Sequence, residues 1–404
     1  MRRLGMLVLA AAAACSRSPD PDHPKPDAPA GVDSGTDATA AGLPPPIAAA
    51  DFPNALDMAF IRGLQTWVDD PTFALKWQDM QTAPIAFLGA ANSAYHADLA
   101  SRATPLPGGE VICHGDSKLD NFGWIEAAGS GSDAALGGFS DADFDDAGAC
   151  PAAADILHFL LATDIQLSDP TLDDAVLDAY IDTVTSDANA VAVDPTTAPA
   201  WTSERSDGVD GDTKNSKIKL GGEVVAPSTD ELTAVTALVA GDTRFPTSLL
   251  DVAKDVKTTG GSAGLRRFWV LVEDKTHPRT IIELKELAEP GTEFGPHSTT
   301  YDGDDRFDVL KPFWWQVAAP GDHFGVDLLG THFLARDRYG KVTPDATKLP
   351  SSQTDGFLLA EASLMAQRHR GAWAGVDPAA LRSWLHASAA TLSARWLAAF
   401  QAAQ

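Results

Sequence analysis

Residues 16–48 limit what this chain can fold into. Pro, Asp, Ala, Gly and Ser dominate the segment, and it contains no aromatic residue. Such a composition cannot bury enough apolar surface to offset the entropy lost on ordering. We therefore expect residues 16–50 to be a disordered tether in which His23 is solvated, and we expect the folded domain to span residues 51–404.

The residues before the tether have the features of a secretory leader. Residues 1–3 include two arginines, Leu4–Ala14 is apolar and Cys15 follows directly. This order predicts a signal peptide over residues 1–15. A Cys after small residues resembles the bacterial lipobox, in which the Cys is lipidated, although Ala12 stands where a large aliphatic residue is usual. Plain cleavage nearby is the alternative.

The sorting rules of Gram-negative bacteria, by the same resemblance, associate a residue such as Ser16 with the outer membrane. We therefore expect an exported protein that is anchored to the cell envelope only through lipid on Cys15.

The charge balance excludes some partners. Lys and Arg number 30 against 56 Asp and Glu, so the formal net charge is −26. A generic nucleic-acid binder needs a clustered basic surface, and a polybasic lipid contact needs the same. No apolar run of membrane-spanning length follows the leader. We expect no nucleic-acid partner, and we expect a monomer.

Apolar spacing predicts the main elements of the domain. Helices are expected over 56–68, 73–80, 86–100, 155–164 and 172–185, and over most of 355–404, with Trp373, Trp384 and Trp396 in the core. Strands are expected at 111–113, 268–273 and 280–285, the last two forming a hairpin connected through His277-Pro278. Residues 186–230 are polar and are expected to be loop or insertion.

The segment that carries chemistry reads C-H-G-D-S-K-L-D-N-F over residues 113–122. An acidic turn with the sequence D-A-D-F-D-D follows over residues 141–146. Phosphoryl transfer needs a carboxylate that takes the acceptor hydroxyl's proton, and an amide with a second carboxylate to hold a metal. The spacing of five between Asp116 and Asn121 lets one tight loop present both side chains to one cleft.

These residues resemble the catalytic loop and metal-binding Asp of the protein kinase-like superfamily, especially its aminoglycoside and choline kinase branch. The resemblance implies that Asp116 is the base, that Lys118 contacts the transferred phosphate, and that Asn121 and Asp143 bind Mg²⁺. It also places Asp155 as a buried helix residue that braces the loop. The supporting residues of the site are His114, Asp145 and Asp155.

A glycine turn and a strand lysine, which a kinase-like site also needs, come later in the chain. Residues 260–266 read G-G-S-A-G-L-R, and glycines allow backbone N–H groups to approach phosphate oxygens. A surface hairpin turn explains this cluster equally well. Lys285 ends an apolar strand and is expected to bind the nucleotide phosphates, together with Gly261, Ser262 and Gly264.

The whole arrangement resembles the uncharacterised bacterial family called domain of unknown function 2252 (DUF2252), over roughly residues 55–375. The matching motifs, in the same order, are P-I-A-F at 84–87, G-D at 115–116 through N-F-G at 121–123, D-F-D-D-A at 143–147, D-I at 155–156, G-S-A-G-L-R at 261–266 and K-E at 285–286.

That resemblance implies an α+β, protein kinase-like, two-lobed fold with permuted motif order and a mostly helical larger lobe. It implies a catalytic segment at about 84–185, a glycine turn and lysine hairpin at about 255–290, and C-terminal helices at about 355–404. Arg336 and His369 match further family positions, and for each a structural role is as good an interpretation as a substrate contact.

Three positions depart from the family pattern. Gly89 stands where an Arg is expected, Lys118 where a His is usual, and Thr259 where the later turn has its first Gly. The departures concern substrate contacts and nucleotide binding. The residues expected to carry the chemistry are retained.

Cys113 and Cys150 flank the expected cleft. An exported protein meets oxidising conditions, so a disulfide between them is one alternative, and two buried free thiols are the slightly favoured other.

Two functions remain open. One is phosphotransfer from ATP or another nucleotide, with Mg²⁺, to a hydroxyl of a small molecule, glycan or protein. The other is a non-catalytic envelope lipoprotein that binds a ligand or nucleotide on a kinase-like scaffold. Export favours the second, because little ATP is present outside the cytoplasm.

Overall fold

The computed structural model describes residues 42–126, 136–143, 145–167, 170–186, 193, 208–273, 279–301, 323–343 and 351–404. The described residues lie in one compact unit that begins at Gly42. The predicted leader, Cys15 and most of the tether lie outside them. Helices and antiparallel sheets occupy separate stretches of the chain, so the predicted α+β class is confirmed.

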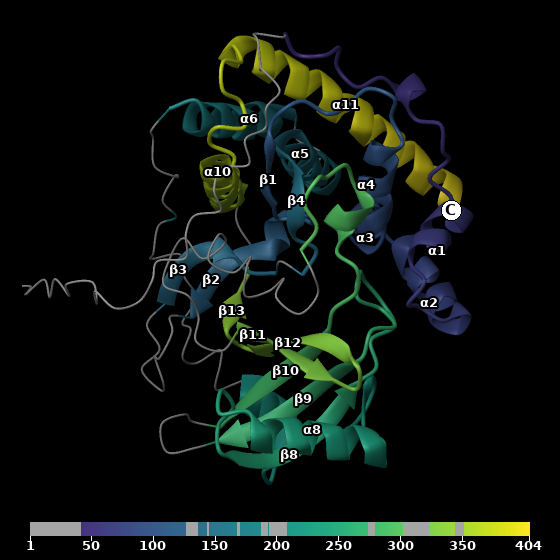
Figure 1. Ribbon diagram of the computed structural model, residues 1–404, viewed down its shortest axis with the longest axis vertical. Coiled ribbons are helices and arrows are strands. Elements are labelled where there is room, and N and C mark those ends of the chain that lie inside the picture. Colours follow the sequence, from purple (N-terminus) through teal and green to yellow (C-terminus); the bar gives the residue numbers. More distant parts are fainter. Residues whose placement is uncertain are drawn as a thin grey trace, which may run out of the picture. The chain divides into compact units, whose positions relative to one another are not determined.

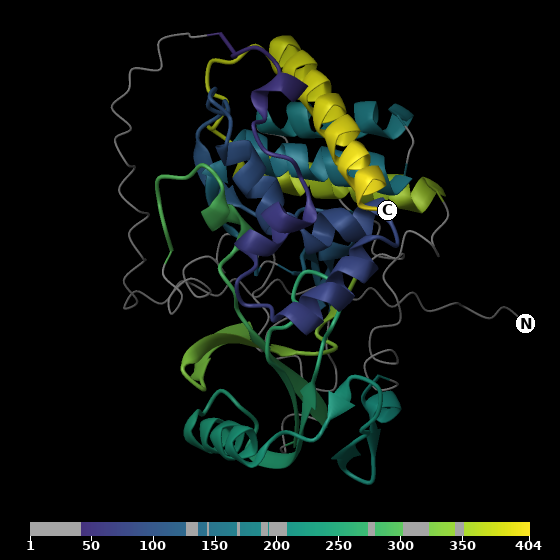
Figure 2. The same ribbon diagram turned by 90° about the vertical axis from the view of Figure 1, so that its right-hand side faces the viewer.

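Most helices gather on one side of the structure, away from the large sheet (Figure 1). They are α1 (Met58–Leu64), α2 (Asp70–Met80), α3 (Pro84–Ala90), α4 (Asn92–Ala100), α5 (Ala152–Leu167), α6 (Pro170–Val184), α10 (Ser351–Arg368) and α11 (Pro378–Ala403). Aspartate side chains cap the starts of α1, α2 and α11 by accepting a backbone N–H of the first turn. Helix α5 is buried almost all round, and α11 packs against it, running obliquely across the helical part of the structure (Figure 2).

The tryptophans predicted for the core are buried there, with Trp373 4%, Trp384 3% and Trp396 1% exposed. The single helix predicted over 86–100 is instead two helices that meet at Ala91, whose dihedral angles are not helical. The side-chain amide of Gln65 donates to the Ala90 carbonyl at 2.7 Å. That hydrogen bond gives the Ala90 carbonyl a partner at the point where the helix is interrupted.

The folded chain begins earlier than the predicted boundary at residue 51. Ile47 is 2% exposed, and its N–H donates to the Ser388 hydroxyl at 3.1 Å. The Trp384 indole donates to the Pro45 carbonyl at 3.2 Å. The tether prediction over 16–50 was therefore too long, because the few apolar residues at its end pack against α11.

A six-stranded antiparallel sheet lies on the other side of the structure, with the order β11-β12-β10-β9-β8-β7. Its strands are β7 (Val224–Val225), β8 (Ser248–Asp255), β9 (Arg267–Glu273), β10 (Thr280–Glu286), β11 (His323–Leu328) and β12 (Thr331–Asp337). The predicted hairpin is confirmed as β9 and β10, although its connection lies outside the described residues. Residues 186–230, expected to be loop or insertion, include the short strands β5 (Thr213–Lys214), β6 (Lys217–Ile218) and β7.

Alternation along the strands gives this sheet two chemically different faces. Apolar residues of β9 and β10, among them Phe268, Val270 and Leu284, pack with helix α8 (Thr229–Gly241) on one face. Residues directly opposite each other in a pair share a face, and the register pairs Glu283 with Arg336 and Lys285 with Arg267. The four charged side chains therefore lie together on the face away from α8.

Two smaller sheets flank residues 113–122, the segment that the sequence singled out. Strand β1 (Glu110–Cys113) pairs with β4 (Gly148–Pro151), and β2 (Phe122–Glu126) lies between β13 (Lys341–Val342) and β3 (Leu136–Asp141). A disulfide joins Cys113 to Cys150, with Cα atoms 5.8 Å apart. Of the two alternatives for these cysteines, the slightly favoured one, two free thiols, was wrong, because antiparallel pairing of β1 with β4 brings the residues together.

No helix in the described part of the chain combines the length and apolar character needed to cross a bilayer.

Candidate functional site

A cavity of about 390 Å³ lies between the charged face of the large sheet and the helical part of the structure. Most residues that the sequence singled out line it: Asp116, Lys118, Asn121, Asp143, Asp145, Gly261, Ser262 and Lys285. His114, Asp155 and Gly264 do not line it. The structure thus brings together residues that are as far apart in the chain as Asp116 and Lys285.

Hydrogen bonds to Asp155 of α5 hold the loop that carries Asp116. The Asp155 carboxylate accepts the N–H groups of His114 at 3.0 Å and Gly115 at 3.2 Å, and it contacts Nε2 of His369 at 3.2 Å. Burial opposes the charge on Asp155, but the His369 contact together with the nearby His114 and Arg368 outweighs it, so the pKa of this carboxyl lies below its usual range. His369, which is fully buried, therefore has a structural contact here.

Gly115 can hold its position only because it lacks a side chain. Its φ is +82°, in the left-handed region, and a Cβ there would lie 2.0 Å from the Asp146 carbonyl oxygen. Residues 113–122 and the acidic turn thus touch backbone to backbone at this point.

Asp116 is 9% exposed and has three polar neighbours. The Asn121 amide donates to its Oδ2 at 2.9 Å, and the Lys118 ammonium contacts the same oxygen. Nε2 of the buried His158 lies 3.8 Å from Oδ1. Burial raises the pKa of Asp116 to about 7, against the opposing charge of Lys118.

The acidic turn is attached to the same loop. The Asn121 carbonyl accepts the N–H groups of Ala142 at 2.8 Å and of Asp143 at 3.3 Å. These bonds place Asp143 beside Asn121, so the two residues expected to bind metal are neighbours.

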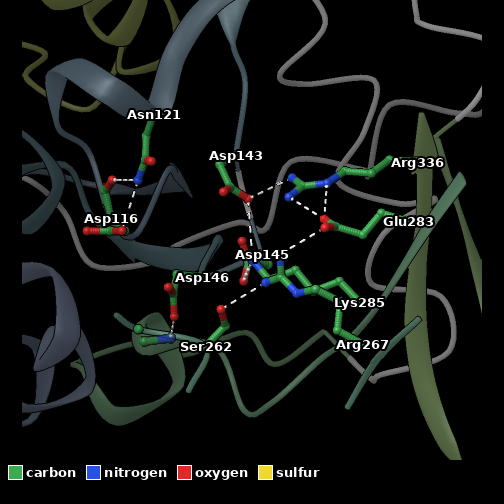
Figure 3. A network of polar contacts seen from close by, with 12 residues as sticks. Asp116, Asn121, Asp143, Asp145, Asp146, Ser262, Arg267, Glu283, Lys285 and Arg336 are labelled. Atoms are coloured by element: carbon green, nitrogen blue, oxygen red, sulfur yellow. Dashed lines mark hydrogen bonds and ion pairs between the residues drawn. The ribbon is translucent and has the colours of Figure 1, made fainter. Parts of the chain in front are cut away.

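The carboxylate of Asp143 lies among three cations, of which Arg336 and Lys285 are labelled in Figure 3. Arg336 approaches it at 3.2 Å, Lys341 at 3.3 Å and Lys285 at 3.6 Å. Burial opposes the charge, but these cations outweigh it and hold the pKa of Asp143 well below its usual range. Lys285 makes its shorter contact, 2.6 Å, with Asp145, whose pKa is raised by burial.

Glu283 organises the sheet side of the site. It is 1% exposed and binds Arg336 at 2.8 Å and Arg267 at 2.9 Å. Arg267 also donates to the Ser262 hydroxyl at 3.0 Å, which ties the glycine turn to the sheet (Figure 3). A buried carboxylate with two arginines is costly to break and gives these side chains one arrangement.

Sequence reasoning missed Arg267, Glu283 and Lys257 as cavity or supporting residues. Alternation through the predicted hairpin would have placed Arg267 and Glu283 on the face that Lys285 occupies. Only the strand register shows that Glu283 also pairs with Arg336 of β12.

The glycine turn uses most of its backbone donors internally. The N–H groups of Ala263, Gly264 and Leu265 are bonded within the segment 257–262, and that of Gly260 donates to Asp79 at 3.1 Å. Gly264 has a φ of +83° and a site for Cβ only 3.2 Å from the Val68 side chain, so it allows packing against Val68. Its expected part in a nucleotide contact has no support from this position.

Helix α2 holds the turn from the other side. The ammonium of Lys76, which is fully buried, donates to the Gly261 carbonyl at 2.8 Å. Burial lowers the pKa of Lys76 to about 7. Among the described residues, the N–H groups of Gly261 and Ser262 are the donors of this turn that remain without an acceptor.

Two of the departures from the family pattern are in contact with each other. A Cβ on Gly89 would lie 3.5 Å from Nζ of Lys118. The absence of a side chain at position 89 leaves room for the Lys118 ammonium. A cation is therefore present at this wall of the cavity, supplied by Lys118 and not by the Arg that the family pattern has at position 89.

The cavity offers some of the oxygen donors that a hard cation such as Mg²⁺ prefers, but not a complete set of ligands. In the described part of the chain, no group of three or more His, Cys, Asp or Glu side chains is arranged to hold a metal ion. Mg²⁺ is commonly bound by one or two carboxylates, with substrate phosphates and water completing its shell. Asn121, Asp143 and Asp145 line one cavity and provide oxygen donors of that kind.

Comparison with known proteins supports part of the expected resemblance. No curated protein and no solved structure matches the chain. The sequence resemblance was expected over roughly residues 55–375. The match found covers Asp116, Asn121, Asp143 and Asp155, whereas the resemblance of the glycine turn and Lys285 stays a prediction. Residues 69–187 of this chain match the family described as "uncharacterized protein conserved in bacteria (DUF2252)".

Proposed function

We propose that this protein transfers a phosphoryl group from ATP or another nucleotide to a hydroxyl group of a small molecule, glycan or protein. The observation that carries the proposal is the meeting of Asp116, Asn121, Asp143 and Lys285 in one cavity. This set supplies a carboxylate for the hydroxyl proton, oxygen donors and a cation, which are the groups that phosphoryl transfer requires.

Each residue has a role that follows from its surroundings. Asp116 accepts the proton of the attacking hydroxyl, whose oxygen forms a bond to phosphorus as the bond to the nucleotide leaving group breaks. Its pKa near 7 suits a base that works at neutral pH. Lys118 and Lys285 stabilise the negative charge on the phosphoryl oxygens.

Asn121 and Asp143, with Asp145 beside them, would hold Mg²⁺, whose chemistry is to neutralise phosphate charge. In the structure Lys285, Arg336 and Lys341 surround Asp143 and balance its charge. This arrangement keeps Asp143 ionised, which a metal ligand requires.

The proposal includes a kinase-like fold with permuted motif order. An antiparallel sheet carries Lys285, a helical part carries Asp116, and the cavity lies between them. The catalytic loop precedes the lysine strand in the chain. These features support the proposal, which rests on the sequence resemblance for its family relationship.

We further propose export and lipid anchoring through Cys15 to the cell envelope, with the outer membrane of a Gram-negative bacterium as the location. The support is the leader-like sequence of residues 1–15 and the Cys113–Cys150 disulfide, a bond that forms in oxidising compartments.

The test is a phosphotransfer assay with labelled nucleotide, Mg²⁺ and a panel of hydroxyl acceptors. The Asp116→Asn variant removes the proton acceptor while keeping the side chain's shape, and we expect transfer to fall by a factor of about 10² to 10⁴. Asp70→Asn is the matched control, since the Asp70 side chain is 91% exposed and outside the cavity. Transfer that is equal in Asp116→Asn and wild type would refute the assigned base.

One observation favours the second candidate, a binding lipoprotein without catalysis. The glycine turn is fixed to α2 by Lys76 and Asp79, and most of its N–H groups are engaged. This candidate would be favoured if the protein bound nucleotide but neither transferred the phosphoryl group to any acceptor nor hydrolysed the nucleotide.

A further inference from the structure

Lys257 is the cation of the cavity that has no ion-pair partner among the described residues. The other four cavity cations each contact a carboxylate: Lys118 with Asp116, Arg267 with Glu283, Lys285 with Asp145 and Arg336 with Glu283. Lys257 is half-buried, and its ammonium would lie 3.9 Å from a Cβ on Gly260. It therefore lies alongside the glycine turn, and no carboxylate of the described residues is in ion-pair contact with it.

The neighbours of Lys257 make this placement unfavourable in the absence of a ligand. Burial lowers its pKa, and the nearby charges of Arg267 and Lys285 lower it further, whereas the charges of Asp143 and Glu283 oppose this shift without reversing it. Partly buried charges need an opposite charge or hydrogen bonds to offset the loss of water. An anion in the cavity would supply both to Lys257.

Residues with free backbone donors line the same cavity as this ammonium. The Lys257 carbonyl accepts the N–H of Gly264 at 3.1 Å, which fixes the start of the glycine turn to its end. The N–H groups of Gly261 and Ser262, which lie between these two residues, have no acceptor in the described part of the chain. Oxyanions bind where backbone N–H groups and a cation converge.

We propose that Lys257, with the N–H groups of Gly261 and Ser262, binds a phosphate group of a di- or triphosphate anion in this cavity. The assignment of that anion to a phosphate donor rests on the proposed function, whereas the binding site itself does not. The recognised chemistry is the polyphosphate chain, which a nucleotide and inorganic tripolyphosphate share.

The experiment is titration calorimetry of the purified protein with tripolyphosphate in one arm and ATP in the other, both with Mg²⁺. In Lys257→Gln we expect the dissociation constant for tripolyphosphate to rise by about tenfold to a hundredfold, the loss typical of one charge-assisted hydrogen bond. Lys257→Arg keeps the charge and should retain most of the affinity. Thermal unfolding of each variant without ligand verifies its folding.

Lys254→Gln is the matched control. Lys254 lies three residues away, outside the cavity lining, and pairs with Glu231 at 2.6 Å. Its removal deletes the same charge from the protein, and we expect less than about a twofold change. A dissociation constant that rises equally in both variants would show a general charge effect and overturn the proposal.

The remaining outcomes separate the site from the proposed function. Binding of tripolyphosphate that depends on Lys257, without phosphotransfer to any acceptor, supports the site and counts against the function. If wild type transfers phosphate, and Lys257→Gln is equally active and binds both anions equally tightly, the site is overturned and the proposed function stands. Failure of wild type to bind either anion also overturns it. Equal Lys257-dependent affinity for both anions identifies the phosphate chain as the recognised part, and a tighter ATP complex adds a contact to the nucleoside.

Discussion

Replacing Gly115 by Ala tests how the segment over residues 113–122 is joined to the acidic turn. Position 115 has a φ of +82°, which costs an L-residue about 1–2 kcal/mol. The new Cβ would also lie 2.0 Å from the Asp146 carbonyl oxygen and 2.6 Å from its carbon. Backbone at such a distance must move, and overpacking of this kind costs a further ~1–3 kcal/mol.

We therefore expect Gly115→Ala to lower the free energy of unfolding by about 2–5 kcal/mol. Urea-induced unfolding followed by tryptophan fluorescence measures this change. Because Asp146 must shift, the turn that carries Asp143 and Asp145 shifts as well, and binding of Mg²⁺-nucleotide should weaken more than stability alone explains.

Gly63→Ala is the control for this substitution. Gly63 lies in α1, has no atom within 4 Å of the site of a Cβ, and has an ordinary φ. Alanine there should be neutral or stabilising by up to about 1 kcal/mol. A Gly115→Ala protein that is as stable as wild type would refute the close backbone contact between residues 115 and 146.

Two further predictions concern the support of the site. The two cysteines of the disulfide are 37 residues apart, so its reduction should lower the free energy of unfolding by about 4 kcal/mol. For a unit of about 360 residues this corresponds to a fall in Tm of about 5 °C. Calorimetry with and without reductant measures the fall, and an unchanged Tm would contradict the prediction. Asp155→Asn should destabilise the protein by about 1.5–3 kcal/mol at pH 7. Because the native pKa of Asp155 is depressed, its contribution is present above about pH 4 and is lost as pH falls further; urea unfolding at pH 7 and pH 3 measures it, and an equal loss at both values would refute the sign.

Local patterns were sufficient to predict several elements. The apolar runs at 268–273 and 280–285 are confirmed as the β9–β10 hairpin, and Val111–Cys113 lies in β1. Trp384 and Trp396 are in the core. These features follow from hydrophobic periodicity, which depends only on residues that are near in sequence.

Features that depend on distant pairing could not be predicted in this way. The disulfide needed the pairing of β1 with β4, and the Glu283–Arg336 contact needed the register of β10 with β12. Ile47 is buried because Ser388 and its helix are nearby, which no local composition reveals.

The candidate site shows the same division. Motif spacing indicated Asp116, Asn121, Asp143 and Lys285, and all four line one cavity. Motif spacing could not show that most donors of the glycine turn are already engaged, since these bonds depend on the turn's conformation and on Asp79 of α2. It also gave no signal for Lys257.

The central claim is that this cavity binds a nucleotide together with Mg²⁺ held by Asp143, and thermal unfolding of the purified protein tests it most directly. Mg²⁺-ATP at 100 times its dissociation constant adds about 2.7 kcal/mol to the folded state, which corresponds to a rise in Tm of about 3–4 °C for this chain. We predict that rise in wild type and in the Asp70→Asn control, and its loss in Asp143→Asn. A Tm that no nucleotide changes, or a rise that Asp143→Asn retains in full, would contradict the account.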